Sequence, residues 1–235
     1  MAQSKYPLAR PQNANGYDPT RGSEARHRGT GACRRGYPLV MDATRLPHLD
    51  TALRLLALSA SSYTGRVFRI LAPLYGNKVD ALSGNGSSRA SGRFHAQGAF
   101  RIVYTGCTLQ QAEWEHAHTT RNSGLSREDT LPITTLSADV SFSRILDLTD
   151  RKVRRRLKVT KPDLSQNTWS ASPGETLTQV IGRLAHPHGF EAILAPSSGP
   201  SDNLNILPQN LLSGSFIRII NEDKLPRPAK VPLIK

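Results

Sequence analysis

The chain has 235 residues, enough for one large domain or for one domain with an appended arm. Its net charge of +13 favours an anionic partner, such as a nucleotide, nucleic acid, an acidic protein or a membrane surface. No apolar run approaches the roughly 20 residues of a membrane span. No secretory signal is visible, and the two cysteines have neither metal-ligand spacing nor a disulfide framework. We therefore expect a cytoplasmic protein that needs no metal and no membrane.

Residues 1–40 predict a basic, disordered arm. They hold four prolines, and seven Lys or Arg against two acids. Such a segment has too little apolar surface to offset the entropy lost on ordering. A solvated tail, an overlong start assignment and an electrostatic tether to nucleic acid all remain open. The folded domain is expected in residues 41–235.

The next elements follow from hydrophobic periodicity. Leucines at helical spacing predict a helix over 46–58, and residues 67–71 predict a strand. A glycine-rich loop follows over 84–92, then a strand over 100–104. Thr108 is placed as the N-cap of a helix over 109–118.

The second half predicts more strands than helices. Residues 119–130 are expected to be a loop, Asp150 precedes a basic helix over 151–158, and a further helix covers 176–185. Strands are expected over 131–136, 140–148, 190–195, 203–207 and 215–220. Because strands and helices alternate without regular βαβ spacing, we predict an α+β domain rather than a doubly wound sheet.

The segment Asp80–Phe94 is the first candidate site. Gly84 and Gly86 permit backbone angles that other residues resist, and exposed N–H groups in such a turn can bind an anion. Arg89 and Arg93 add planar forks that match phosphate oxygens. The segment predicts a phosphate-bearing ligand, or else a surface turn with solvated arginines.

The helix 109–118 is the second candidate. A carboxylate at Glu115 can stabilise an oxocarbenium-like centre, although a solvated helix acid has the same sequence, and Glu113 is an alternative. His116 and His118 are two residues apart and do not share a helical face, which argues against zinc. The basic run 151–158 fits a solvated face or an acidic partner protein at least as well as nucleic acid.

A series of segments follows one known order: Arg66-Val-Phe-Arg-Ile70, Asp80-Ala-Leu-Ser-Gly-Asn-Gly86, Ser91-Gly-Arg-Phe94, Val103-Tyr-Thr105, Glu115, Ile145-Leu-Asp-Leu-Thr-Asp150, Thr178-Gln-Val-Ile-Gly182, Phe190–Ala195 with Pro196-Ser197, and Asn203. Together they resemble the RES domain, the toxin of RES–Xre toxin–antitoxin systems, over roughly residues 66–210. Phe94 and His95 stand where the family usually has Trp and Asn.

The resemblance implies a mixed-sheet fold like that of the ADP-ribosyltransferases, with flanking helices. It implies a toxin that cleaves the nicotinamide–ribose bond of NAD⁺ by hydrolysis or phosphorolysis, so that NAD⁺ is a substrate and inorganic phosphate a second one in phosphorolysis. A protein ADP-ribosyltransferase is the first alternative, and a non-enzymatic nucleic-acid binder is the second. The implied partner is an Xre-type helix-turn-helix antitoxin, and a homodimer is left open.

The resemblance also assigns roles. Arg69 and Arg93 would clamp the pyrophosphate or the incoming phosphate, and Tyr104 would position the nicotinamide ribose. Glu115 would stabilise the oxocarbenium-like transition state, and Ser197 would form a hydrogen bond within the pocket. The remaining residues expected to shape or support the NAD⁺ site are Ser83, Gly84, Gly86 and Gln179, and the other hydroxyls that could fill the serine role are Ser198, Thr176 and Thr178.

Overall fold

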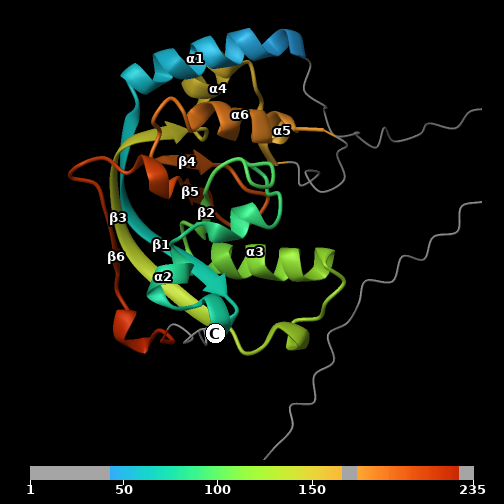
Figure 1. Cartoon of the computed structure of the whole chain (residues 1–235). Coiled ribbons are helices and arrows are strands. Elements are labelled where there is room, and N and C mark those ends of the chain that lie inside the picture. Colours follow the sequence, from blue (N-terminus) through green and yellow to red (C-terminus); the bar gives the residue numbers. More distant parts are fainter. Residues whose placement is uncertain (1–42, 166–173, 228–235) are drawn as a thin grey trace, which may run out of the picture. The chain divides into compact units, whose positions relative to one another are not determined.

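Two long antiparallel strands, β1 (Ser61–Leu71) and β3 (Thr134–Asp147), organise the fold (Figure 1). The computed structural model describes residues 43–165 and 174–227, so the predicted arm over 1–40 lies outside the described residues. β1 and β3 pair from Leu71↔Thr134 to Ser61↔Ile145. The shorter strands pair with the remaining free edges of β1 and β3.

The sheet closes on itself. β2 (Val103–Gly106), β5 (Asn203–Ile206) and β4 (Ala192–Ala195) join β1 to the end of β3 in the order β1-β2-β5-β4-β3. Since β1 also pairs with β3, these five strands form a ring of pairings, and β6 (Phe216–Ile219) adds to β3 outside it. The β3–β4 pair is parallel and the other pairs are antiparallel, so the sheet is mixed.

Alternation of small polar and apolar residues makes β3 a strand. Leu136, Ala138, Val140 and Phe142 are buried at every second position, as a strand with one core face requires. Between Phe142 and Ile145, β3 carries one residue more than β1 does, which makes a β-bulge. Beyond the bulge, Ile145 and Leu146 are buried in two separate clusters.

A buried carboxylate holds this bulge. Glu191 is fully buried, and its Oε2 accepts hydrogen bonds from the amides of Ser143 (2.8 Å) and Arg144 (2.9 Å). Its Oε1 accepts one from the amide of Leu212 at 3.0 Å. Burial alone would raise the pKa of Glu191, but hydrogen bonds to its carboxylate, those from the amides of Leu212 and Arg144 among them, lower it below its ordinary value. The ionised carboxylate thereby fixes the point where the strand ring bends.

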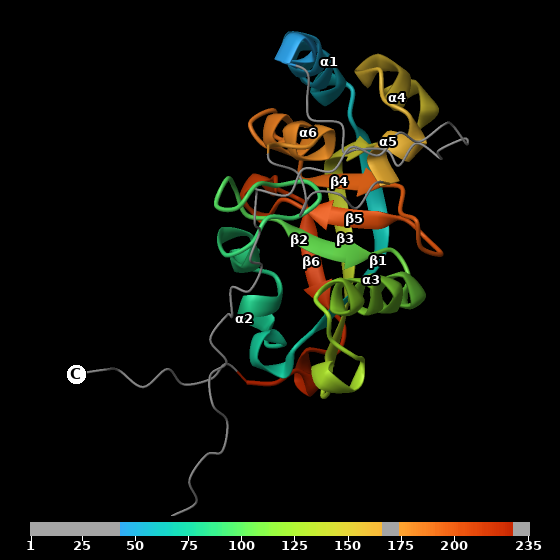
Figure 2. The same ribbon diagram turned by 90° about the vertical axis from the view of Figure 1, so that its right-hand side faces the viewer.

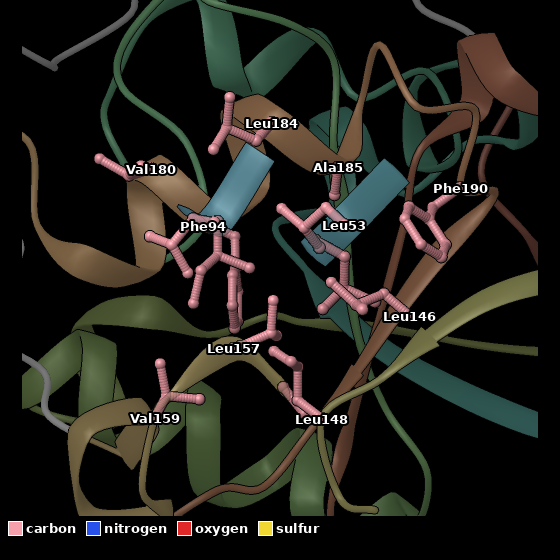
Figure 3. Packing of buried hydrophobic residues seen from close by; sticks show 14 of the residues in the cluster. Leu53, Phe94, Leu146, Leu148, Leu157, Val159, Val180, Leu184, Ala185 and Phe190 are labelled. Atoms are coloured by element: carbon pink, nitrogen blue, oxygen red, sulfur yellow. The ribbon is translucent and has the colours of Figure 1, made fainter. Parts of the chain in front are cut away.

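Four helices cover one end of the sheet: α1 (Leu46–Leu58), α4 (Arg151–Leu157), α5 (Lys161–Ser165) and α6 (Leu177–Ala185) (Figures 1 and 2). Their apolar residues meet the sheet in a cluster that includes Leu53, Leu146 and Phe190, each at most 1% exposed (Figure 3). Phe94 enters the same cluster from the end of the segment Asp80–Phe94, called the glycine-rich segment below. The core therefore fixes the base of that segment.

α3 (Leu109–Asn122) packs against β1 and β2 at the other end of the sheet, and α2 (Lys78–Ala81) lies near this end too (Figure 2). None of the described helices combines the length and apolar content needed to cross a membrane. The prediction of an α+β fold with a mixed sheet and flanking helices is confirmed.

Several predicted bounds were wrong. The two strands predicted over 131–136 and 140–148 are the single strand β3, because polar residues alternate with buried ones without a break from Leu136 to Phe142. β1 begins six residues earlier than predicted, at Ser61, because its exposed first half is held by pairing with β3. α3 continues to Asn122, into the segment predicted to be a loop.

Candidate active site

A cavity of about 510 Å³ lies between β1, β2, the glycine-rich segment and one face of α3. Cavities of this size commonly hold a small molecule or a nucleotide. Five of the residues predicted from the sequence line it: Arg69, Gly86, Arg93, Tyr104 and Glu115. β1, the glycine-rich segment, β2 and α3 each contribute to this set, so segments far apart in the sequence build one wall.

Glu115 is the acid of this cavity. Its Oε1 accepts hydrogen bonds from Gln111 Nε2 (3.0 Å), Ser197 Oγ (3.0 Å) and Asn203 Nδ2 (2.6 Å). Its Oε2 accepts none from the described part of the chain and is the oxygen left for a ligand. Glu113 is exposed and does not line the cavity. Of the two predicted acids, the structure therefore brings only Glu115 to the cavity.

Ser197 has no hydrogen-bonding capacity to spare. Its hydroxyl donates to Glu115 and accepts from Gln111 Nε2 (2.8 Å) and from the amide of Gly199 (3.1 Å). A hydroxyl has one donor and two lone pairs, so all three are used. Ser197 therefore orients the carboxylate and is not poised to act as a nucleophile.

The other candidate hydroxyls lie elsewhere. Ser198 is exposed. Thr176 is the buried N-cap of α6, where its Oγ1 accepts from the amide of Gln179 (3.3 Å) and lies 3.1 Å from Thr178 Oγ1. Among these candidates, Ser197 alone contacts Glu115.

The two arginines differ in what holds them. Arg69 donates one hydrogen bond to the carbonyl of Ala81, at the end of α2, and burial lowers the pKa of Arg69 to about 10. Its guanidinium is therefore charged at neutral pH, and its other donors remain for a ligand. Arg69 thus fits the anion-binding role predicted for it.

Arg93 is 8% exposed and contacts segments that are remote from it in the sequence. Its Nη2 donates to the carbonyls of Leu164 and of Pro196, the latter at 2.6 Å, and its Nε is buried without a partner in the described residues. Burial lowers the pKa of Arg93, an effect that the charge of Glu115 opposes. Because Pro196 precedes Ser197, Arg93 latches the loop that places Ser197 on Glu115.

Tyr104 holds the glycine-rich segment. Its hydroxyl accepts from the amide of Phe94 (3.0 Å) and lies 2.9 Å from His95 Nδ1. His95 Nε2 lies 2.9 Å from the carbonyl of Ala90, which can only accept, so the proton is assigned to Nε2 and Nδ1 accepts from Tyr104. Burial lowers the pKa of His95, which keeps the imidazole neutral, and burial raises the pKa of Tyr104.

The remaining predicted residues shape that segment. Gly84 has φ +68°, and a Cβ there would lie 2.9 Å from the amide nitrogen of Ile102, so the turn requires glycine. Gly86 faces open space in the cavity wall. Ser83 does not line the cavity, and its hydroxyl donates to the carbonyl of Asp80 at 2.9 Å. Arg89 is exposed, lies outside the cavity lining and donates to the hydroxyl of Tyr75 at 3.3 Å.

Gln179 acts on the loop and not on the cavity. Its amide nitrogen donates to the carbonyls of Gly92 (3.1 Å) and His95 (3.2 Å), and its oxygen accepts from the amide of Thr176 at 2.9 Å. It does not line the cavity. Gln179 therefore supports the segment that carries Arg93 from outside the cavity.

Gln111 was missed by the sequence analysis. It is fully buried and donates toward Glu115, Ser197 and Asn203. The available indication was its position four residues before Glu115, on the same face of one helix. Asn203, quoted in the sequence analysis without a role, supplies the shortest hydrogen bond to Glu115, at 2.6 Å.

The two histidines of α3 contact other side chains. His116 lies 3.2 Å from Thr130 Oγ1, and His118 stacks on Trp114 with ring centroids 5.0 Å apart. No group of three His, Cys, Asp or Glu side chains that could hold a metal ion occurs in the part of the chain that the structure describes.

This arrangement can do specific chemistry. Two guanidinium groups and one carboxylate share the cavity, so its net charge favours an anion. The carboxylate, fixed through one oxygen and free at the other, can stabilise a cation that develops beside it. The site is therefore suited to an anionic ligand that becomes locally cationic during reaction.

The chain is similar to a known protein family in sequence and to a solved structure in fold. A comparison with curated proteins finds no match. A chain of the crystal structure of the M. tuberculosis MbcT–MbcA toxin–antitoxin complex has a similar fold, with a TM-score of 0.56 and 18% sequence identity over 76% of this chain and 90% of that chain. The model of the RES domain matches residues 66–222, more than half of the chain, and spans Arg69, Arg93, Glu115 and Ser197. The chain therefore belongs to the RES domain family.

Proposed function

We propose that this protein is a toxin that cleaves the nicotinamide–ribose bond of NAD⁺. The observation that carries the proposal is the carboxylate of Glu115 in the wall of the cavity, held through Oε1 by three side chains and without a partner at Oε2 among the described residues. A carboxylate held in this way is preorganised, so it costs little reorganisation when charge develops beside it.

The chemistry makes one demand that this site meets. When the bond between ribose C1′ and the nicotinamide nitrogen breaks, its electron pair passes to the nitrogen and neutralises the pyridinium charge. Nicotinamide leaves without needing a proton, and C1′ becomes oxocarbenium-like. Glu115 Oε2 would stabilise this cation until water or phosphate adds to C1′. Addition of water yields ADP-ribose and a proton, and addition of phosphate yields ADP-ribose 1″-phosphate.

The cationic groups of the cavity support an anionic substrate. Arg69 keeps free donors beside the cavity, and a planar guanidinium suits the oxygens of a pyrophosphate. Arg93 would contribute its charge, while its Nη2 stays bound to backbone carbonyls. From the sequence, both arginines were expected to bind the pyrophosphate equally. We now assign this binding chiefly to Arg69.

A protein antitoxin is the expected partner. The structure with the similar fold is that of a toxin–antitoxin complex, and a toxin that degrades NAD⁺ needs an inhibitor in its own cell. We infer that the partner is an Xre-type helix-turn-helix protein. Co-expression should yield a complex in which turnover of NAD⁺ is suppressed, and free turnover in that complex would refute the partner.

The experiment is to incubate the purified protein with NAD⁺ labelled in the adenosine half, with and without phosphate. Release of nicotinamide with free ADP-ribose indicates hydrolysis, and formation of ADP-ribose 1″-phosphate indicates phosphorolysis. Label on protein would favour the ADP-ribosyltransferase alternative. Intact NAD⁺ after prolonged incubation with folded protein would refute all three enzymatic forms of the proposal.

A further inference from the structure

Gln111 departs from the usual capping arrangement at the start of helix α3. The chain contains two Thr-x-x-Gln sequences at helix starts, Thr108–Gln111 and Thr176–Gln179. At α6 the capping box is complete, since Thr176 Oγ1 accepts from the amide of Gln179 and Gln179 Oε1 accepts from the amide of Thr176. At α3 only the first half forms, from the amide of Gln111 to Thr108 Oγ1 at 3.1 Å.

The side chain of Gln111 is directed to the cavity acid instead. Its Nε2 lies 3.0 Å from Glu115 Oε1, 2.8 Å from Ser197 Oγ and 3.0 Å from Asn203 Oδ1. Its Oε1 accepts from the amide of Ser201 at 3.0 Å. A backbone amide can only donate, so this contact fixes which end of the Gln111 amide faces Glu115.

The two hydrogens of Nε2 serve three acceptors, so Gln111 couples the positions of all three groups. α3 carries Glu115, whereas Ser197 and Asn203 belong to the segment that runs from the end of β4 to the start of β5. Gln111 is fully buried and bonds to this segment at Ser197, Ser201 and Asn203, two of which also donate to Glu115. The capping box is incomplete at the same residue, because the side chain of Gln111 accepts from Ser201 and not from the amide of Thr108.

We propose that Gln111 is a positioning residue that fixes the rotation of the Glu115 carboxylate, so that Oε1 is held by protein donors and Oε2 is left for the substrate. The inference rests on the proposed NAD⁺ cleavage. Gln111 does not touch the substrate; it acts through Glu115 and through the loop that carries Ser197. Its effect therefore falls on the rate of bond cleavage and not on the affinity for NAD⁺.

The variants are Gln111→Leu and Gln111→Glu, with Gln110→Leu and Gln110→Glu as matched controls, because Gln110 is exposed on the same helical turn. Gln111→Leu should lower kcat roughly 100-fold while KM changes less than about threefold, as expected when an interaction that matters in the transition state is lost. The Gln110 variants should keep wild-type kcat and KM.

The pH dependence of turnover in Gln111→Glu is a measurement that a purely structural role of Gln111 would leave unchanged. Two carboxylates in contact cannot both be ionised at low cost, so the pair should retain one proton to a higher pH than a lone carboxyl does. In its protonated form Glu at this position donates to Glu115 and restores the missing hydrogen bond. The variant should therefore be active near about pH 5 and lose activity as the pH rises through the raised pKa of the pair. Arg93 and Tyr104 are titratable residues that interact electrostatically with Glu115, and they are the same in Gln111→Glu and in the wild type.

The outcomes separate the two proposals. No turnover of NAD⁺ by the wild-type protein refutes both. Wild-type turnover together with an unchanged kcat in Gln111→Leu, or a pH profile of Gln111→Glu parallel to that of the wild type, refutes the positioning role alone. A loss of kcat in Gln111→Leu together with the inverted pH dependence of Gln111→Glu supports it.

Discussion

Replacing Tyr104 with Phe removes one hydroxyl from the joint between β2 and the glycine-rich segment. That hydroxyl binds the amide of Phe94 at 3.0 Å and His95 Nδ1 at 2.9 Å. Phe fills the same space without the oxygen, so the change leaves both of these polar groups without a partner. Tyr104 was expected from the sequence to position the nicotinamide ribose, whereas in the structure its hydroxyl forms hydrogen bonds within the protein.

The cost follows from these two contacts. A buried donor or acceptor left unsatisfied costs about 1–3 kcal/mol, so the two groups together should lower the free energy of unfolding of Tyr104→Phe by roughly 2–6 kcal/mol. For a domain of this size each kcal/mol corresponds to about 2–4 °C in Tm, which gives a loss of roughly 4–24 °C. The segment also carries Arg93, which latches the carbonyl of Pro196. We therefore expect turnover of NAD⁺ to fall roughly 10- to 100-fold as well.

The assay is thermal unfolding in parallel with nicotinamide release. Tyr63→Phe is the matched control, because within the described residues the Tyr63 hydroxyl makes one weak hydrogen bond, to the sulfur of Cys107 at 3.7 Å. The Tm of this variant should change by less than about 2 °C. An unchanged Tm in Tyr104→Phe would contradict the reasoning. If turnover were lost at the same time, the hydroxyl would act on the substrate and not on the loop.

Three further results are expected. The pKa of His95 is lowered below its ordinary 6.5, so the contribution of His95 to stability is present above about pH 6.5 and is lost as the pH falls through its pKa in the folded protein. His95→Gln should therefore lose less Tm between about pH 8 and pH 5 than the wild type does, and equal losses would contradict this. Arg93→Met should lower the free energy of unfolding in denaturant by about 2–4 kcal/mol, since two backbone carbonyls lose their donor, and a stabilised variant would show that burying the charge costs more than its hydrogen bonds return. Gly84→Ala should cost more than Gly98→Ala, by at least about 1 kcal/mol in the same measurement, because both have positive φ but only Gly84 would place a Cβ against the backbone; equal costs would refute the close contact.

Local patterns in the sequence were sufficient for most helices. α1 has the predicted bounds because its buried leucines recur at helical spacing, and α4 begins directly after Asp150, as predicted. The short helices α2 and α5 were not predicted, since four or five residues carry no measurable periodicity. The closure of the strands into a ring depends on pairings between distant segments, such as Phe68 with Gly106, which no local pattern reveals.

The site was predictable in part, for the same reason. Glu115 and Ser197 could be placed in one pocket because the order of segments resembles a known family, and the structure brings the two side chains within 3.0 Å. Gln111 could not be predicted, because a Thr-x-x-Gln sequence indicates a capping box and its diversion to the cavity depends on the β4–β5 segment. The use of Arg93 as a latch depends likewise on carbonyls remote in sequence.

The most direct test of the central claim is to compare nicotinamide release by Glu115→Gln with release by Glu113→Gln. Both variants remove one negative charge from the same helix, but Glu113 is exposed and only Glu115 lines the cavity. We expect Glu115→Gln to remain folded, with turnover reduced at least about 100-fold, and Glu113→Gln to keep wild-type turnover. Equal, wild-type rates in both variants would contradict the assignment of Glu115 and with it the proposed mechanism.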